Sequence, residues 1–377
     1  MIRSVPSKTT LPLSVWVQTL QQIAAKPLEF CVDFPTIARR FEAWWARNLL
    51  DRPVFIAAAD TNPRRPITRR LELLDQPDAW FEAKFADMLQ LHRVGDALPN
   101  IRVDLGPVLL GGMFGGMLEF GADTSWTRAF INDDWSNAPE WIIHDDNHWW
   151  TLLQELMQRV AENAAGRYLV CTPDLGGSGD VLLNLRGSTQ LCLDMIDQPH
   201  HACQAIDAIY AAWHRVFTTL YECAVKKGAG LIHWLGLWSN RPYIIPACDF
   251  NSMIGPNEFE SIFLPDIAHQ ATTVGRAVFH LDGPDAARHI DALLKVPDIQ
   301  AIQFTPGAGT PSALAWVHTF RRIQQCNRSL LVVCPPEEVI ALCEALRPEG
   351  LGILLDAPLA PSELNDLFAQ LCRRYSC

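Results

Sequence analysis

The stretch from residue 277 to residue 311 constrains the fold of this chain most strongly. It begins with the apolar run 277–281, which the polar turn Asp282-Gly283-Pro284-Asp285 ends. Apolar residues then recur at helical spacing between 286 and 294, and a second apolar run follows at 299–304. Two buried strands joined by a helix form a right-handed parallel unit. The stretch therefore predicts an α/β fold with parallel strands.

Similar short apolar runs recur along the chain, separated by helical segments and ended by turn residues. The eight predicted strands cover residues 53–59, 101–104, 168–172, 230–235, 277–281, 299–304, 329–333 and 351–355. This alternation predicts a (β/α)8 TIM barrel. Residues 1–50 carry two apolar stripes of helical period and are interpreted as an N-terminal helical extension. The barrel is then assigned to residues 51–377, and a division of the chain into two domains is the alternative.

Composition limits the classes of partner. The net charge of −11 and the sequence pI of about 5.4 argue against nucleic acid. No apolar run approaches the roughly 20 residues of a membrane span, and the first residues do not read as a signal peptide. The 11 cysteines are odd in number and form no CxxC pair. We therefore expect reduced thiols in a cytoplasmic protein. The expected partner is a small-molecule substrate.

Polar residues at the ends of predicted strands form the first candidate site. His280 and Asp282 are two residues apart on one strand and so point to the same side. Gln303 takes the matching position on the next strand, and ligands bind at the carboxyl ends of parallel strands. We therefore expect these three side chains to line one cavity floor. The alternative is that His280 and Asp282 only stabilise the turn.

Other candidates lie in the loops that follow predicted strands. Arg64 and Arg65 belong to a basic loop that is either a solvated face or a clamp for carboxylates and phosphates. Asp104 ends the second strand, and a Gly-rich loop with Asp174, Asp180 and Arg186 follows the third. The Gly-rich run 109–120 lacks the Gly-Lys-Ser/Thr of a phosphate loop. Within the polar cluster 144–148, the residues 145–147 are expected to cap the next helix rather than to bind metal.

Three segments resemble the uroporphyrinogen decarboxylase superfamily. They are CDFNSMIGPNEF at 248–259 with Leu264-Pro265, FHLDGP at 279–284 and AIQFTPGAG at 301–309. The resemblance covers roughly residues 50–375 and implies a (β/α)8 barrel. It also implies one of two activities. The superfamily contains decarboxylases of tetrapyrroles and zinc-dependent enzymes that move methyl groups between corrinoid proteins and thiols.

The methyltransferase branch implies a zinc site at the strand ends. Its His-x-Cys motif corresponds here to His280-Leu281-Asp282, and aspartate is an acceptable zinc ligand. Cys334, at the end of the seventh strand, is the candidate sulfur ligand, and an inert buried thiol is the alternative. Three protein ligands leave the open position that catalytic zinc needs. Methyl transfer of the corrinoid or thiol type is our main expectation.

This hypothesis gives roles to further residues. With His280 and Asp282 as catalytic residues, Glu119, Asp180 and Asp249 would handle protons or orient the substrate. Three tryptophans are expected to wall an apolar pocket suited to a flat or methylated cationic ligand, with ordinary core packing as the alternative. They are Trp126, Trp234 and Trp238. The chain has no Asp-x-His-x-x-Gly motif, so a corrinoid would be carried by a partner protein.

Two other hypotheses remain open. A decarboxylase would need no cofactor; Arg64, Arg65 and Arg186 would bind the carboxylates of the substrate, and Asp104 or Asp249 would stabilise a cationic intermediate. The arginines come later in the loop than in the decarboxylases, after Asp60. A barrel without catalytic activity that binds a tetrapyrrole or corrinoid for delivery is the third hypothesis.

Overall fold

The computed structural model describes residues 11–62, 64, 66–122, 124–307, 312–356 and 358–375. It begins with two helices, α1 (Leu13–Ala24) and α2 (Phe34–Trp45), which are the two helices predicted within residues 1–50. Pro35 lies in the first turn of α2, where the missing N–H is tolerated. Whether residues 1–50 are an extension separate from a domain over 51–377 stays a prediction.

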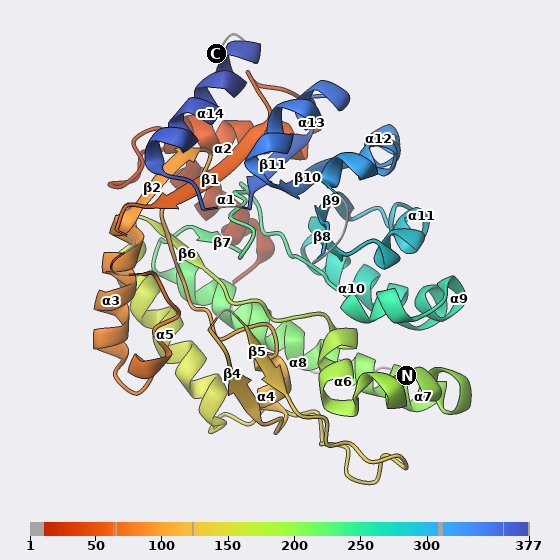
Figure 1. Ribbon diagram of the computed structural model, residues 1–377. Coiled ribbons are helices and arrows are strands. Elements are labelled where there is room, and N and C mark those ends of the chain that lie inside the picture. Colours follow the sequence, from red (N-terminus) through yellow and green to blue (C-terminus); the bar gives the residue numbers. More distant parts are fainter. Residues whose placement is uncertain are drawn as a thin grey trace.

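Six strands form the main sheet, in the order β2-β1-β11-β10-β9-β8 (Figure 1). Their bounds are Val54–Asp60 for β1, Leu91–Gly95 for β2, Ala277–Asp282 for β8, Ile299–Thr305 for β9, Ser329–Cys334 for β10 and Leu351–Leu355 for β11. Every neighbouring pair is parallel except β1 and β2. The carboxyl ends of the five parallel strands therefore lie at one edge of the sheet.

A second, three-stranded parallel sheet has the order β3-β6-β7. Its strands are β3 (Asn100–Arg102), β6 (Leu169–Cys171) and β7 (Leu231–Ile232). All eight strands predicted from the sequence are thus present, and the parallel α/β class is confirmed. Over the described residues, however, the hydrogen-bonded ladders form separate sheets and no closed ring.

The segment 244–247 lies against the outer edge of β8. Ile244 forms a parallel bridge with Ala277, and Ala247 forms one with His280. The backbone N–H groups of Val278 and His280 donate to the carbonyl groups of Ile244 and Pro246. This short segment continues the parallel order of the main sheet beyond β8.

Three strands were missing from the prediction. β2 begins at Leu91, directly after the helix α3 (Pro77–Gln90), so no turn residue separates the two elements. The hairpin of β4 (Leu118–Phe120) and β5 (Ser125–Thr127) lies outside the eight predicted strands. Strands of three residues are too short to show an alternation of polar and apolar residues.

The helices lie mostly around the outside of the sheets (Figure 1). The remaining ones are α4 (Leu109–Met113), α5 (His148–Ala164), α6 (Ser178–Arg186), α7 (Ser188–Asp197), α8 (Pro199–Lys226), α9 (Pro256–Glu258), α10 (Leu264–Val274), α11 (Ile290–Leu293), α12 (Val317–Gln325), α13 (Val339–Ala345) and α14 (Pro361–Tyr375). The predicted cap of α5 is confirmed, since the Asn147 side chain accepts from the Trp150 N–H. Among the described helices, none is both long and apolar enough to cross a bilayer.

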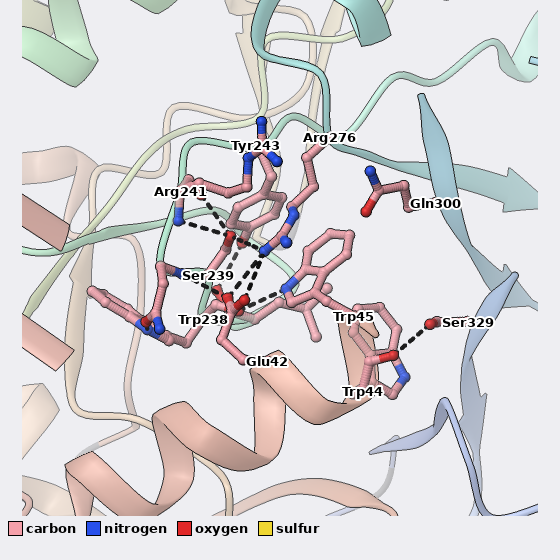
Figure 2. Close-up of polar contacts among 12 residues, drawn as sticks. Glu42, Trp44, Trp45, Trp238, Ser239, Arg241, Tyr243, Arg276, Gln300 and Ser329 are labelled. Carbon is pink, nitrogen blue, oxygen red and sulfur yellow. Dashed lines mark hydrogen bonds and ion pairs between the residues drawn. The ribbon is translucent and has the colours of Figure 1, made fainter. Parts of the chain in front are cut away.

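Helix α2 is anchored at the amino ends of the strands (Figure 2). Arg276, which precedes β8, donates to the Glu42 carboxylate at 3.0 Å. The Ser329 hydroxyl, at the start of β10, donates to the Trp44 carbonyl oxygen at 2.6 Å. The Trp45 indole N–H donates to the Trp238 carbonyl oxygen at 2.9 Å. Because α2 packs at this end, the carboxyl ends of the strands remain for ligands.

Asp266 supports the start of α6 from inside the protein and makes stability depend on pH. Its carboxyl group is buried and accepts from Ser178 Oγ at 3.0 Å and Gln270 Nε2 at 2.9 Å. Burial raises the pKa of Asp266 from its ordinary value of 3.8 to about 7. The unfolded chain therefore loses this proton between about pH 4 and 7 while the folded chain keeps it, so stability falls as pH rises through that interval.

Replacing Asp266 with asparagine is expected to remove this loss. At pH 8 the D266N variant should be more stable than the parent by about 2–4 kcal/mol, and at pH 4 the two should be equal. Gln270 Oε1 has no partner, so a turn of that amide satisfies the new N–H group. Urea unfolding at both pH values measures the difference, with the exposed Asp75→Asn as control. A D266N protein less stable than the parent at pH 8 contradicts this account.

Candidate metal centre at the strand ends

His280, Asp282 and Asp249 meet at the carboxyl end of β8. Each offers one ligand atom, and these atoms all lie within 4.8 Å of one another. His280 and Asp282 share a face of the strand, as their spacing predicted. Asp249 follows the segment 244–247. The bridge from this segment to His280 places the residues after it beside the end of β8. One imidazole and two carboxylates in this arrangement have the ligand chemistry of a divalent metal site.

Gln303 orients the imidazole of His280. The two residues are register partners on β8 and β9, and Gln303 Oε1 forms a short hydrogen bond with His280 Nδ1. The other end of the amide is also held, since Gln303 Nε2 donates to Thr305 Oγ1 at 2.7 Å. Because an amide oxygen only accepts, Nδ1 of His280 carries the proton, and Nε2 is left as the ligand atom. The expected convergence of His280 and Gln303 is thus seen in the structure.

Trp234 contacts the other side of the site. Its ring meets the His280 ring edge-on, with the centroids 5.0 Å apart and the planes at 84°. Trp234 also lines a small pocket together with Asp174 and the aromatic residues Trp213 and Phe217 of α8. The pocket is small, with a volume of about 30 Å³. A small group of the substrate fits there, beside Trp234.

His233 forms a neutral, fixed part of the pocket wall. Its Nε2 donates to the Tyr243 carbonyl oxygen at 2.7 Å, so Nδ1 accepts from the Thr172 hydroxyl at 2.6 Å. Burial lowers the pKa of His233 to about 4, which keeps the ring uncharged at neutral pH. With both nitrogens in use, His233 is a structural residue of the pocket and contributes no metal ligand.

Asp180 lies in the first turn of α6, next to Asp249. Gly177 in the preceding loop packs so closely on the Ala247 carbonyl oxygen that no side chain fits there, which holds α6 against the segment 244–247. Asp180 Oδ1 accepts from the Phe250 N–H at 3.3 Å. Burial, and then the negative charge of Asp249, raise the pKa of Asp180 well above its ordinary value. The protonated form of Asp180 is therefore favoured.

Asp249 and Asp174 are also hard to ionise. Loss of hydration raises the pKa of Asp249 most; the nearby His280 lowers it, and the charges of Asp282 and Asp174 raise it. Burial likewise raises the pKa of Asp174, although the Gly176 N–H opposes this. A bound cation relieves this repulsion between carboxylates. Although neighbouring groups shield its carboxyl group from water, the Asp249 residue as a whole is exposed, so solvent ions reach the site.

Asp104 lies beyond the end of β3, close enough to Asp174 for the charges of the two groups to interact. It accepts from the Gly106 N–H at 3.1 Å and forms a 3.6 Å ion pair with Arg102. Both Asp104 and Arg102 influence the pKa of Asp174. Asp104 thus remains a candidate substrate-binding residue.

Two of the predicted tryptophans do not wall the pocket. Trp238 is fully buried, meets Phe34 of α2 edge-on and donates its indole N–H to Asn240 Oδ1. Trp126 is 55 % exposed on the hairpin strand β5. Glu119, on the paired strand β4, forms an exposed ion pair with Arg128. No contact in the described structure brings Trp126 or Glu119 to the metal centre.

Arg186 has a structural role, and its guanidinium group is not available to bind a substrate. It is buried, forms two hydrogen bonds of 2.6 and 2.7 Å with Asp194, and lies over the Trp135 ring. Its other donors bind main-chain carbonyl groups of the loop 131–133. Arg64 is exposed, and Arg65 lies outside the described residues. The carboxylate clamp expected from these arginines is not assembled by the described contacts.

Cys334 is buried at the end of β10 and is absent from the three-residue group. Burial raises the pKa of its thiol, which disfavours the thiolate that a metal needs. Asp249 takes the third position in its place. The sequence signal for Asp249 was weak, because three residues separate it from the short apolar pair Ile244-Ile245 and no strand was predicted there.

Comparisons with known proteins concern the fold. No family model matches this chain, and no curated protein matches it. A methyltransferase from Methanosarcina mazei is similar in structure, with a TM-score of 0.56 over 90 % of this chain and 99 % of that chain. The two sequences are 12 % identical, so the similarity extends to the fold alone. The chain therefore shares the overall α/β fold of that methyltransferase.

Proposed function

We propose that this protein is a metal-dependent methyltransferase of the corrinoid or thiol type, acting on a small substrate. The observation that carries the proposal is the convergence of Asp249, His280 and Asp282 at the carboxyl end of β8. The similarity in fold to a methyltransferase supports it. As part of the same proposal, the two parallel sheets are the walls of a (β/α)8 barrel of the uroporphyrinogen decarboxylase superfamily.

The donor set fits zinc. Zinc accepts imidazole nitrogen and carboxylate oxygen, and three protein ligands leave a position for substrate. Loss of hydration, and then the negative charges of Asp282 and Asp174, raise the pKa of Asp249, and a cation at this place would offset the repulsion between these carboxylates. When bound, zinc would lower the pKa of a substrate thiol and so make it a nucleophile at neutral pH.

The protein's own residues supply orientation and a proton. Gln303 holds His280 in the tautomer that presents Nε2. Asp180, whose protonated form is favoured, is placed beside Asp249 to exchange a proton with the substrate or the leaving group. The small pocket beside Trp234 offers an apolar and aromatic wall for the group to be transferred.

The methyl donor in this proposal is a corrinoid on a partner protein. Free thiols among the described cysteines, such as Cys171 and Cys248, support our proposal of a reducing, cytoplasmic compartment. Decarboxylation is less well supported, because the donors of Arg186 are already used inside the protein. The proton-holding carboxyl groups around the centre favour an enzyme over a passive carrier.

Elemental analysis and a methyl-transfer assay test the proposal. The purified chain is expected to hold one equivalent of zinc, or to take it up after dialysis. With methylcobalamin and a panel of small thiols, the zinc-loaded protein should speed the loss of the methyl–cobalt absorbance, and a chelator should stop the reaction. A protein that takes up no divalent metal and demethylates no corrinoid would remove this function.

A further inference from the structure

A second cavity of about 520 Å³ lies away from the metal centre. Its wall includes Gly95 of β2, whose register partner Ile56 is near the amino end of β1. The link between α1 and α2 and the helix α14 complete the wall, with Phe30, Cys31 and Phe368 among its residues. The volume falls in the range of roughly 300–1,000 Å³ that small-molecule sites occupy. The cavity is therefore large enough for an organic ligand.

Two of the three arginines in this wall are already neutralised. Arg40 forms ion pairs of 2.5 Å with Asp51 and with Asp96. Arg52 forms an ion pair of 2.7 Å with Asp96 and lies over the Phe368 ring. Two guanidinium groups thus face two carboxylates, and this part of the wall has no net charge.

Arg93 is the exception. Its guanidinium donates to the main-chain carbonyl oxygens of Met88 at 2.5 Å and Leu91 at 3.3 Å. No carboxylate of the described residues forms an ion pair with Arg93. Asp33 is exposed in the same wall, but it forms no ion pair with Arg93 either. Burial lowers the pKa of Arg93 to about 10, which reflects a poorly hydrated cation. In a chain of net charge −11, a poorly hydrated guanidinium group without an ion-pair partner in a cavity wall favours an anionic ligand.

We propose that this cavity binds a small organic carboxylate, which pairs with Arg93 and lays its apolar body against Phe30, Leu91 and Phe368. A carboxylate matches the one guanidinium group of the wall that has no ion-pair partner, and its two oxygens match the guanidinium fork. A phosphate dianion would need a second free cation, and Arg40 and Arg52 are both paired. The proposal is independent of the metal centre and of methyl transfer.

Binding of simple probes to the full-length protein tests this site. Benzoate and hexanoate at about 10 mM, above the millimolar Kd of a weak ligand, are expected to raise the Tm and to give binding heats. Benzamide and inorganic phosphate, at matched ionic strength, should do neither. The Arg93→Gln variant is expected to weaken carboxylate binding at least about tenfold, and Arg93→Lys should retain part of it.

Arg39→Gln is the matched control, because Arg39 is exposed on α2 and lies outside the cavity wall. This variant should bind benzoate and hexanoate like the parent. The site is refuted if neither carboxylate binds, or if R93Q and R93K both bind them as the parent does. Equal binding of benzamide would show that only the apolar wall matters, and equal binding of phosphate would overturn the choice of carboxylate. Should R93Q fail to fold, R93K and the amide comparison still decide.

Discussion

Replacing His280 with alanine is expected to abolish tight metal binding and to lower methyl transfer by more than about a hundredfold. Loss of residues that only orient a ligand already costs roughly 10–100-fold in metal affinity, and loss of a ligand costs more. His280 contributes the sole nitrogen of the three-residue group. Zinc content after dialysis and the rate of corrinoid demethylation measure the effect. The exposed His269→Ala is the control and should leave both unchanged.

Two further variants resolve the ligand set. If the group is Asp249, His280 and Asp282, Asp249→Asn should lose metal and Cys334→Ala should keep it. The opposite result would restore Cys334 as the ligand. Gln303→Leu, which frees the imidazole of His280, should weaken metal binding by about 10–100-fold without removing a ligand.

The same site should release its metal on acidification. The pKa of Asp249 is raised, chiefly by loss of hydration, so protons compete with the metal at higher pH than for an ordinary aspartate. Metal affinity is therefore expected to fall with pH before the protein unfolds. Zinc retention measured over a series of pH values, together with circular dichroism, separates release from unfolding.

Replacing Asp96 with alanine is expected to cost about 3–5 kcal/mol of stability, the range found when one partner of a buried ion pair is removed. Asp96 is completely buried and accepts from Arg40 at 2.5 Å, Arg52 at 2.7 Å and the Phe55 N–H at 2.9 Å. Alanine leaves two buried guanidinium groups and one main-chain donor without this partner. The change also loosens α2, which carries Arg40, from the start of β1.

Urea unfolding, followed by the shift in midpoint, measures this cost. Asp51→Ala is the matched control, because Asp51 also pairs with Arg40 but its side chain is 32 % exposed. We expect the control to lose no more than about 1–2 kcal/mol, since solvent partly screens the carboxylate of Asp51. If D96A and D51A unfold at the same urea concentration, the central role of Asp96 is refuted.

Local patterns were sufficient for the elements that carry the site. Apolar runs ended by turn residues predicted β8 and β9, because strands buried in a parallel sheet are apolar on both faces. The two-residue period placed His280 and Asp282 on one side, and the matching strand ends predicted the approach of Gln303. The cap of α5 at Asn147 was likewise predicted from residues adjacent in the sequence. Each of these depends on neighbours in sequence or on adjacent parallel strands.

The chain's amino-acid sequence by itself therefore determined the parallel α/β class and two of the three residues of the candidate centre. Tertiary structure alone decided which third side chain joined His280 and Asp282: Asp249, through two bridges of the segment 244–247, and not Cys334. It also turned Arg186 and Trp238 inward, to partners that no local pattern specifies. The physical reason is that periodicity fixes which side of an element a residue faces, whereas burial, charge pairing and metal geometry depend on which distant segment packs there.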